Sequence, residues 1–440
     1  MSTKALNGIN LLAITLFLFC EVALLFFTPR SESVQLLVLY AAMFGAYLVL
    51  YHELKNIRTA AFLGVFFRLI ACLAFPALSD DLYRFVWDGS LILEGVSPYL
   101  ATPTAFFAEH VSMPYEALYP KLNSANYFSV YPPVIQFFSA FAALVANDIY
   151  LSSLVIKLPL LLAEIATIWM LPGLLLRMKI SPKYSALYFL NPLIIVDALA
   201  NAHFEVLVVF FLLLALHQLQ LKQIGSSAIA LGLAVGTKLL PLIFFPFLLK
   251  AMAAPQRLKF ATVFVMSCVI LLSPFLFTEN LAGMFNSLQL YYQRFEFNAS
   301  IYYILRGIVG SVLGYNPIAY VGPLLAVVQI LLLLWVWLKQ DGLSIKAAIR
   351  SMLIANTIFL LLSTTVHPWY LVPLIALGIF SRSVYPLVWS GVIILSYTAY
   401  RQETYEELLW ITAVEYLVLI IALVFPDQFR RMIKRPLRSL

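Results

Sequence analysis

Long apolar runs follow one another along almost the whole chain. Each of the longer runs approaches the roughly 20 residues that an α-helix needs to cross a hydrocarbon layer about 30 Å thick. The runs are apolar on every side, whereas strands of a membrane barrel alternate apolar and polar residues over about 10 positions. The pattern therefore predicts membrane-spanning helices at 9–28, 34–51, 60–78, 150–176, 184–201, 204–221, 260–277, 316–338, 350–366, 384–400 and 408–425.

Four shorter apolar pieces, 132–147, 226–238, 239–252 and 369–381, leave the number of crossings open. A helix of about 13–16 residues is only about 20–24 Å long, which is less than the hydrocarbon thickness. The first long run exceeds the apolar core of a signal peptide, and no small-residue cleavage site follows it, so we expect it to be retained. The sequence predicts an all-α polytopic membrane protein of about 11–14 transmembrane helices, with one domain over 1–440.

The composition excludes a soluble globular protein. The chain has 440 residues, of which 63% are hydrophobic and 11% are charged, whereas a soluble domain has about 25% charged residues. Its cysteines, Cys20, Cys72 and Cys268, lie inside apolar runs and show neither a metal-binding spacing nor a disulfide framework. The net charge of +7 does not call for nucleic acid, because its distribution along the chain explains it better.

Successive loops of the chain are alternately rich and poor in basic residues. Of the 28 Lys and Arg, 19 fall in the termini and in one set of short loops, and six fall in the other set. By the positive-inside rule the basic set faces the cytoplasm. Both termini are then on the cytoplasmic side of a plasma (inner) membrane, the basic tail 426–440 lies against anionic lipid, and the long loops 79–131 and 278–315 face outward.

This sidedness requires an odd number of crossings between the outer loop 79–131 and the inner loop 177–183. Either 132–147 is a half-embedded helix on the outer side, or 150–176 is not one simple span. We favour the first alternative.

The stretch Ser79-Asp80-Asp81-Leu82-Tyr83-Arg84-Phe85-Val86-Trp87-Asp88-Gly89 carries most of the candidate chemistry in the outer loop. Its spacing predicts a short amphipathic helix at the membrane surface, which Gly95 and Pro98 would end. Asp80 and Asp81 would point about 100° apart on that helix. We expect one of them to face a substrate and the other to hold backbone, Arg84 or a cation. The alternative is a solvated helix start, where acidic residues are common.

Further polar residues lie at the same predicted face, and ionisable groups at membrane depth are candidates for function. They are Asn201, His203 and Glu205 in one turn, Lys238 between two short apolar pieces, Arg294, Glu296 and Asn298 in the second outer loop, and His367 with Trp369 and Tyr370 in His-Pro-Trp-Tyr. Histidines near span ends also occur as ordinary hydrogen-bonded residues, and Trp and Tyr as interface aromatics. Inside the bundle, Arg68 and Lys157 are expected to pair with carboxylates such as Glu164.

The order of these motifs resembles a known family. The motifs are Asp-Asp-x-Tyr-Arg-x-x-Trp-Asp-Gly (80–89), Gly-x-x-Pro-Tyr (95–99), Tyr-Pro-Pro (131–133), Asn-Pro (191–192), Asn-x-His (201–203), Lys-x-x-Pro (238–241) and His-Pro-Trp-Tyr (367–370). Over about 60–380 the chain resembles the GT-C fold glycosyltransferases, and most of all the bacterial polyprenol-phosphate-mannose-dependent mannosyltransferases. It is also similar to the eukaryotic glycosylphosphatidylinositol mannosyltransferase I. It departs from the pattern in having two spans before the acidic loop and Phe204-Glu205 after Asn-x-His.

The resemblance implies a GT-C-type bundle that transfers a sugar, with mannose the first expectation, from a polyprenyl-phosphate donor to an acceptor hydroxyl, with inversion, on the extracytoplasmic face. We expect Asp80 or Asp81 to be the general base, with a preference for Asp81. Candidates for binding the donor phosphate are Lys238, Arg294, Arg306 and His367. Candidates for binding sugar or acceptor are Arg84, Trp87, Asp88, Tyr99, Asn201, His203, Glu205, Asn298 and Tyr370.

We expect no required cofactor and no dedicated metal site, although a divalent metal is compatible with this chemistry. The expected partners are the lipid-linked sugar, membrane lipids and a glycan, lipid or protein acceptor, without nucleic acid. The alternative function is a transporter or flippase of lipid-linked sugars. Such proteins usually have inverted repeats and charges near the bilayer midplane. Here the charges gather at one predicted face and we find no repeat, which favours the transferase. A structural scaffold would leave that polar face unexplained.

Overall fold

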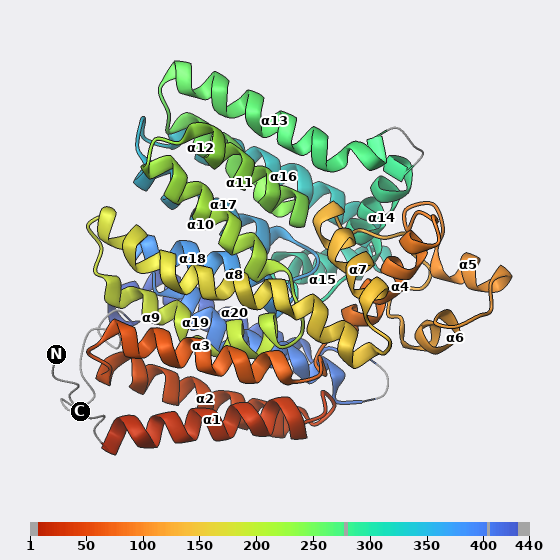
Figure 1. The fold of residues 1–440 in the computed structure, drawn as a ribbon, viewed down its shortest axis with the longest axis horizontal. Coiled ribbons are helices and arrows are strands. Elements are labelled where there is room, and N and C mark those ends of the chain that lie inside the picture. Colours follow the sequence, from red (N-terminus) through yellow and green to blue (C-terminus); the bar gives the residue numbers. More distant parts are fainter. Residues whose placement is uncertain (1–7, 277–279, 403–404, 430–440) are drawn as a thin grey trace. The chain divides into compact units, whose positions relative to one another are not determined.

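The computed structural model describes residues 8–276, 280–402 and 405–429 (Figure 1). Within these ranges all regular structure is helical except for one isolated bridge between Phe297 and Thr365. Six of the described helices are long and apolar enough to cross a membrane, so the protein is an all-α polytopic membrane protein, as the sequence predicts. Most of the predicted basic tail, together with residues 1–7 and 277–279, lies outside the described ranges.

The chain divides into two compact units. Unit 1 contains Met1–Leu78, Leu161–His203 and His367–Leu440, and unit 2 contains Ser79–Leu160 and Phe204–Val366. The single domain predicted from the sequence stays a prediction. Each unit is described below by itself.

Unit 1 holds the first three helices and the last ones, which pack around a buried centre. Its elements are α1 (Gly8–Phe27), α2 (Ser33–Glu53), α3 (Ile57–Leu73), the second half of α8 (Ile149–Arg177), η2 (Pro182–Ser185), α9 (Ala186–Phe189), η3 (Leu193–Leu199), η5 (Pro368–Leu371), α18 (Val372–Ser381), α19 (Tyr385–Val392), η6 (Ile393–Tyr400) and α20 (Leu409–Val424). In its interior Arg68 donates to Glu164 over 2.7 Å with both side chains fully buried, which confirms this predicted pair.

Unit 2 holds the two long outer loops of the prediction and the helices between and after them. Its elements are α4 (Asp81–Leu93), α5 (Pro103–Glu109), α6 (Tyr115–Leu118), η1 (Tyr119–Lys121), α7 (Pro133–Val145), the first half of α8, α10 (Glu205–Gln220), α11 (Ile224–Thr237), η4 (Leu240–Phe244), α12 (Phe245–Lys250), α13 (Ala254–Leu276), α14 (Asn280–Arg294), α15 (Ile301–Leu313), α16 (Ile318–Lys339) and α17 (Ile345–Leu362).

Helix α8 decides between the two alternatives for the region after the first outer loop. It runs without a break over 29 residues, which contradicts the alternative that 150–176 is not one span. Helix α7 has only 13 residues and would reach about 20 Å, too short to cross the hydrocarbon. The half-embedded α7 favoured from the sequence therefore keeps its support and stays a prediction.

Two predicted spans are wrong as continuous helices. The run 184–201 forms the end of η2, then α9 and the π-helix η3, because Pro192 lacks an N–H and the Asn191 side chain accepts the N–H of Leu193 over 3.0 Å. The run 384–400 changes from α19 to the 3₁₀-helix η6. The predicted span 60–78 ends early, since α3 stops at Leu73 and leaves an irregular segment before α4.

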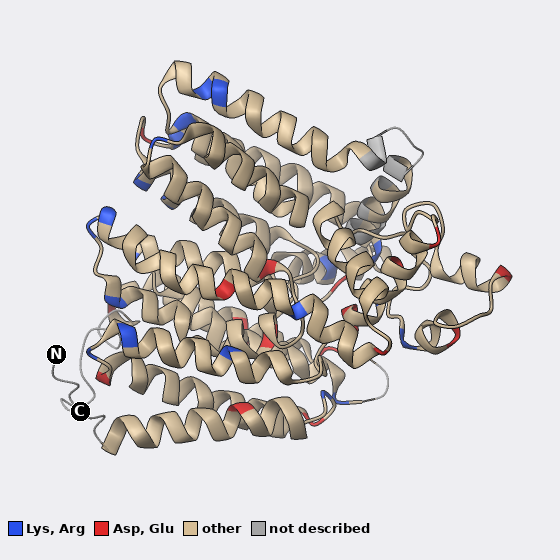
Figure 2. Cartoon of the chain, in the orientation of Figure 1, with Lys and Arg blue, Asp and Glu red and all other residues tan. Residues whose placement is uncertain are grey.

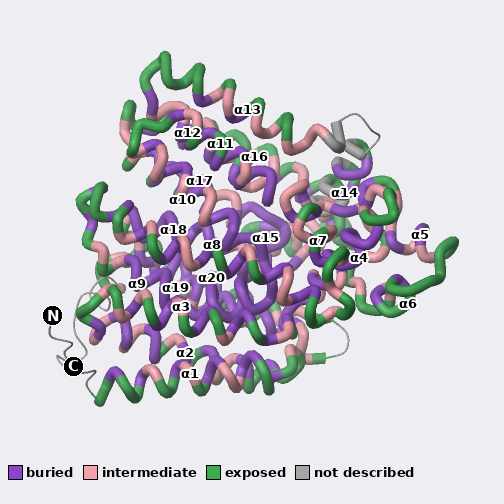
Figure 3. Tube along the Cα trace, in the orientation of Figure 1, coloured by how far each residue is buried: buried purple, intermediate pink, exposed green. Residues whose placement is uncertain are grey.

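Several helices keep apolar side chains exposed, as lipid contact requires. In α13 only 11% of its most apolar window is buried. Figure 3 shows many exposed positions along α13, whereas η3 in unit 1 is buried throughout. Apolar surface of this extent is unfavourable in water and favourable in a bilayer.

Basic residues gather at one end of the helices of unit 2. Lys222 follows α10, Lys250 ends α12, Arg257 and Lys259 begin α13, and Lys339 ends α16. The ends of α12 and α16 meet, since Lys250 Nζ donates to the Trp337 carbonyl over 2.7 Å. Figure 2 shows Lys and Arg near the ends of α12 and α13 and few along their lengths. That this end faces the cytoplasm stays a prediction.

Candidate active site

Helix α4 carries the acidic pair, and its limits match the sequence prediction. Asp80 precedes the helix and Asp81 is its first residue. The backbone N–H of Asp81 donates to Ser79 Oγ over 3.3 Å. The helix ends at Leu93, and Gly95 turns the chain with a φ of 77°, a conformation that glycine adopts easily.

Asp81, in unit 2, is partly buried and lies close to other charged side chains. Its carboxylate is half-buried and accepts a hydrogen bond from Asn123 Nδ2 over 3.4 Å. Burial raises the pKa of Asp81 above its ordinary value, Asp80 adds to that rise, and the positive charge of Lys238 opposes it without cancelling it. A partly buried carboxylate with a raised pKa suits acid–base chemistry.

Lys238 joins this cluster through an ion pair with Glu205. Its Nζ lies 2.5 Å from Glu205 Oε1, and the side chains are 23% and 4% exposed. Unit 2 therefore brings together the carboxylates of Asp80, Asp81 and Glu205 and one lysine, from α4, the start of α10 and the end of α11. The sequence predicted all four as site residues, but not that Lys238 pairs with Glu205.

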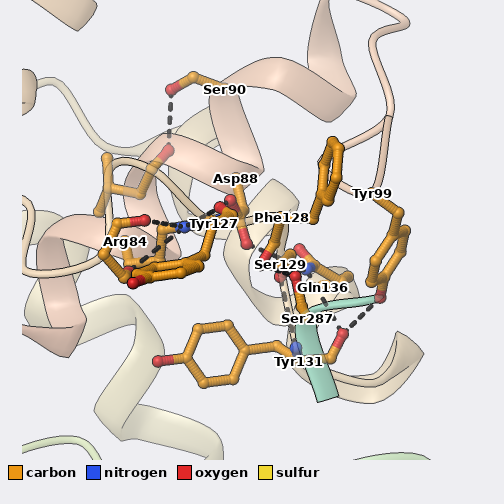
Figure 4. A network of polar contacts seen from close by, with 12 residues as sticks. Arg84, Asp88, Ser90, Tyr99, Tyr127, Phe128, Ser129, Tyr131, Gln136 and Ser287 are labelled. Carbon is orange, nitrogen blue, oxygen red and sulfur yellow. Dashed lines mark hydrogen bonds and ion pairs between the residues drawn. The ribbon is translucent and has the colours of Figure 1, made fainter. Parts of the chain in front are cut away.

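Arg84 and Asp88 form a buried ion pair on the next turn of α4 (Figure 4). Arg84 Nε donates to Asp88 Oδ1 over 2.7 Å, and its Nη1 donates to the carbonyls of Ser124 and Tyr127, each over 3.0 Å. Asp88 Oδ2 accepts from Gln136 Nε2 over 3.1 Å. Arg84 and Asp88 hold the end of the outer loop against α4 and α7. Their predicted contacts with sugar or acceptor stay predictions, which this internal pairing does not favour.

Tyr99 is tied to the same network. Its hydroxyl donates to the carbonyl of Tyr131, and only 1% of the residue is exposed. Burial raises the pKa of Tyr99 above its ordinary value, so the phenol stays neutral. Close by, Ser287 of α14 donates to the Phe128 carbonyl over 3.0 Å (Figure 4). A Cβ on Gly283 would lie 1.8 Å from the Tyr99 carbonyl oxygen, so α14 can approach the loop only with glycine there.

Trp87 belongs to the core of the outer loop. It is fully buried and packs edge-to-face on Tyr115, with ring centroids 4.7 Å apart, and on Phe106. Stacking on a sugar needs an exposed ring face, so the burial of Trp87 does not support the predicted sugar contact.

The candidate phosphate ligands of the second outer loop differ in their surroundings. Arg306 pairs with Glu296 over 2.5 Å, and Glu296 also accepts from Tyr302 over 2.6 Å. Arg294, in the last turn of α14, is exposed. Arg306 thus has an internal partner, whereas Arg294 presents its side chain to the surface.

A short backbone pairing that the sequence did not reveal fixes Asn298. The N–H of Phe297 donates to the Thr364 carbonyl over 3.1 Å, and the N–H of Val366 donates back to the Phe297 carbonyl over 2.8 Å. Asn298 follows with a φ of 46° and is fully buried. No periodicity marks so short a pairing in the sequence.

The remaining candidates, Asn201, His203, His367 and Tyr370, lie in unit 1. The indole of Trp369 stacks between the imidazoles of His203 and His367, with ring centroids 3.6 Å and 4.4 Å away. Tyr370 meets His367 edge-on at 5.4 Å. The structure therefore gives Trp369 a central place that its interpretation as an interface aromatic had missed, although its His-Pro-Trp-Tyr motif marked the region.

Among the described residues, no group of three or more His, Cys, Asp or Glu side chains is arranged to hold a metal ion. The expectation that no metal is required stays a prediction.

Comparison with known proteins decides the family. Residues 22–254, more than half of the chain, match the family described as alpha-(1->6)-mannopyranosyltransferase, N-terminal domain. The chain belongs to this mannosyltransferase family. No curated protein matches the chain. Together with its apolar helices, the match makes the protein a membrane mannosyltransferase and confirms the GT-C family resemblance predicted from the motifs.

The matched segment of this mannosyltransferase contains the carboxylate cluster and the loop network. It includes Asp80, Asp81, Arg84, Trp87, Asp88, Tyr99, Asn201, His203, Glu205 and Lys238, whereas Arg294, Asn298, Arg306, His367 and Tyr370 lie beyond it.

Proposed function

We propose that this mannosyltransferase moves mannose from a polyprenyl-phosphate donor to an acceptor hydroxyl, with inversion and with Asp81 as the general base. The observation that carries the proposal is the setting of Asp81: a half-buried carboxylate of raised pKa, in a cluster with the Lys238–Glu205 ion pair. The donor and the inversion are what the resemblance to polyprenol-phosphate-mannose-dependent mannosyltransferases implies.

The residues of the cluster suit the steps of a single displacement. The acceptor oxygen attacks the anomeric carbon while the bond from that carbon to the phosphate oxygen breaks, and the electron pair leaves with the polyprenyl phosphate. Asp81 takes the hydroxyl proton. The developing oxocarbenium character is stabilised by nearby negative charge, which Asp80 and Glu205 supply beside Asp81.

The leaving phosphate needs a cation, and Lys238 is the candidate within the cluster. Its side chain stays 23% exposed while paired with Glu205, so a ligand phosphate can approach it. Arg294, Arg306 and His367 are further candidates. A preorganised cation near a leaving anion stabilises charge that develops in the transition state.

We place this chemistry on the extracytoplasmic face, with both termini cytoplasmic, because 19 of the 28 Lys and Arg lie in the opposite loops and termini. The polyprenyl tail would then lie among lipid-facing apolar helices such as α13. The acceptor is a hydroxyl of a glycan, lipid or protein.

Radiolabelled polyprenyl-phosphate mannose in membranes tests the proposal. We expect the wild type to transfer mannose and release polyprenyl phosphate, and Asp81→Asn to lose at least about 100-fold in kcat at matched expression, since base catalysis contributes about 10²–10⁴. Asp80→Asn, its matched control, should keep more activity. Full activity of Asp81→Asn would overturn the assignment. Movement of intact donor across the membrane without release of polyprenyl phosphate would identify a flippase instead.

A further inference from the structure

The chain crosses from unit 1 to unit 2 beside two of its most polar motifs. It leaves unit 1 after Leu78 and again after His203. Asp80 and Asp81 lie two and three residues beyond the first exit, and Glu205 lies two residues beyond the second. Contacts within unit 1 that hold Leu78 and His203 in place therefore also hold the starting points of the two segments that carry the carboxylate cluster.

One side chain joins the two exits within unit 1. Asn201 Oδ1 accepts the backbone N–H of Leu78 over 2.9 Å, and Asn201 Nδ2 donates to the Val196 carbonyl over 2.9 Å. Asn201 is 1% exposed. Both ends of the amide are thus used inside the protein, which is the arrangement of a clamp and not of a group held ready for an acceptor.

The π-helix η3 explains why an amide is needed at this place. The N–H of Ala200 reaches back five residues to Ile195, and the N–H of His203 reaches back five residues to Ala198. The Val196 carbonyl lies between these bonds and takes its hydrogen from the Asn201 side chain. π-Helices are rare and frequent at functional sites. Here the wide turn of η3 brings the Asn201 side chain to Leu78, in the irregular segment that follows α3.

The other backbone group of Leu78 is held from a third direction. Arg30 Nη1 donates to the Leu78 carbonyl over 3.4 Å, and the Arg30 guanidinium lies 4.3 Å from the Tyr400 ring centroid. Leu78 itself is 3% exposed. Its N–H and its carbonyl are both held by side chains far away in the sequence, so this residue is fixed although it belongs to no helix.

We propose that Asn201 is a positioning residue that clamps the two exits of the chain from unit 1, and thereby sets where Asp81 and Glu205 stand for sugar transfer. The proposal rests on the proposed function for its effect on catalysis. It replaces the sequence-based expectation that Asn201 touches sugar or acceptor. A clamp acts on kcat, because a displacement of about 1 Å in a reacting group can reduce the rate by about 100-fold, whereas an acceptor contact acts on the KM of the acceptor.

Two substitutions at Asn201 test the clamp. Asn201→Leu removes both hydrogen bonds at every pH. Asn201→Asp keeps the shape, and its carboxyl reproduces both bonds only when protonated, with the hydroxyl donating to Val196 and the carbonyl oxygen accepting from Leu78. We expect kcat to fall by about 10- to 100-fold in Asn201→Leu with the acceptor KM unchanged. In Asn201→Asp, the ratio of kcat to that of the wild type should rise as the pH falls.

Hydrogen–deuterium exchange at the Leu78 amide tests the clamp without any substrate. We expect about tenfold faster exchange in Asn201→Leu than in the wild type, as loss of one buried hydrogen bond predicts. Asn191→Asp is the matched control, since Asn191 is equally buried in unit 1 and its amide bonds other partners, Ser390 over 3.1 Å and the Leu193 N–H over 3.0 Å. Its Leu78 exchange should match the wild type.

The outcomes separate this proposal from the proposed function. Wild-type exchange at Leu78 in Asn201→Leu, or a raised acceptor KM with unchanged kcat, would overturn the clamp. Faster exchange together with a wild type that transfers no mannose from polyprenyl phosphate would retain the clamp and overturn the donor. If Asn201→Leu does not fold, Asn201→Ala decides by its Leu78 exchange, because the alanine side chain cannot accept the Leu78 N–H.

Discussion

Gly89 lies where α4 crosses α7 in unit 2. Replacing it by alanine tests whether this crossing determines the position of the acidic pair Asp80 and Asp81. A Cβ at this position would lie 2.2 Å from the Ser139 carbonyl oxygen and 3.0 Å from the backbone nitrogen of Ala140. These are backbone atoms of α7, so no side chain can rotate away to make room. The helices themselves must separate.

The size of the separation follows from ordinary contact distances. An unstrained contact of about 3.4 Å requires α4 and α7 to move apart by roughly 1 Å. The bond from Gln136 to Asp88, 3.1 Å long, would then exceed hydrogen-bonding distance. Overpacking of this kind costs about 1–3 kcal/mol. Asp81 lies on the same helix, and a shift of about 1 Å in a catalytic group can reduce the rate by about 100-fold.

The assay for Gly89→Ala combines kcat of mannosyl transfer with the thermal unfolding midpoint in detergent. We expect kcat to fall by about 10- to 100-fold and the midpoint to drop. Gly45→Ala in α2 is the control, because its Cβ meets nothing within 4 Å and alanine favours a helix over glycine by about 0.5–1 kcal/mol. A wild-type kcat and midpoint in Gly89→Ala would refute the argument that this crossing positions Asp81.

Two further substitutions probe charge. In Glu205→Gln, Lys238 loses its anionic partner and Asp81 loses a negative neighbour. The pKa of Asp81 should fall, and the acid limb of the kcat/KM profile should move to lower pH; an unmoved or raised limb would contradict a coupled cluster. In Arg68→Met, Glu164 is left as a buried charge without its partner, so we expect a loss of about 3–5 kcal/mol in a reversible unfolding assay. A loss below about 1 kcal/mol would show that another group compensates the charge.

The length of the apolar runs predicted the long helices well because a membrane span carries apolar side chains along its whole length. It located α1, α2, α8 and α16 to within two residues, whereas α13 begins six residues before the predicted run. It could not find the breaks inside 184–201, since Asn191 and the π-helix η3 change backbone hydrogen bonds without making the segment less apolar. Hydropathy indicates whether a residue prefers water or lipid, but it does not indicate which backbone hydrogen bonds the segment forms.

The start and stop of α4 were predictable from local signals, Asp at its first turn and Gly95 after its end. The partners of its charged residues were only partly so. Arg84 and Asp88 stand four residues apart, a spacing that favours pairing on one helix face. Gln136, which completes the pair, comes from α7, and only the packing of the two helices reveals it.

The hydrogen-bond partners of Asp88 and Asp81 show which of these two carboxylates of α4 supports the fold and which is available for proton transfer. Asp88 is fully buried, and its two oxygens accept from Arg84 and from Gln136, so neither can receive a proton from an acceptor without breaking the network. Asp81 is partly exposed, accepts a long hydrogen bond of 3.4 Å from Asn123 and has a raised pKa. A base must be reachable and must not hold the fold together, and a raised pKa favours uptake of a proton. Asp81 meets these conditions, and the rigid pair one turn further along α4 helps to hold it in a fixed place.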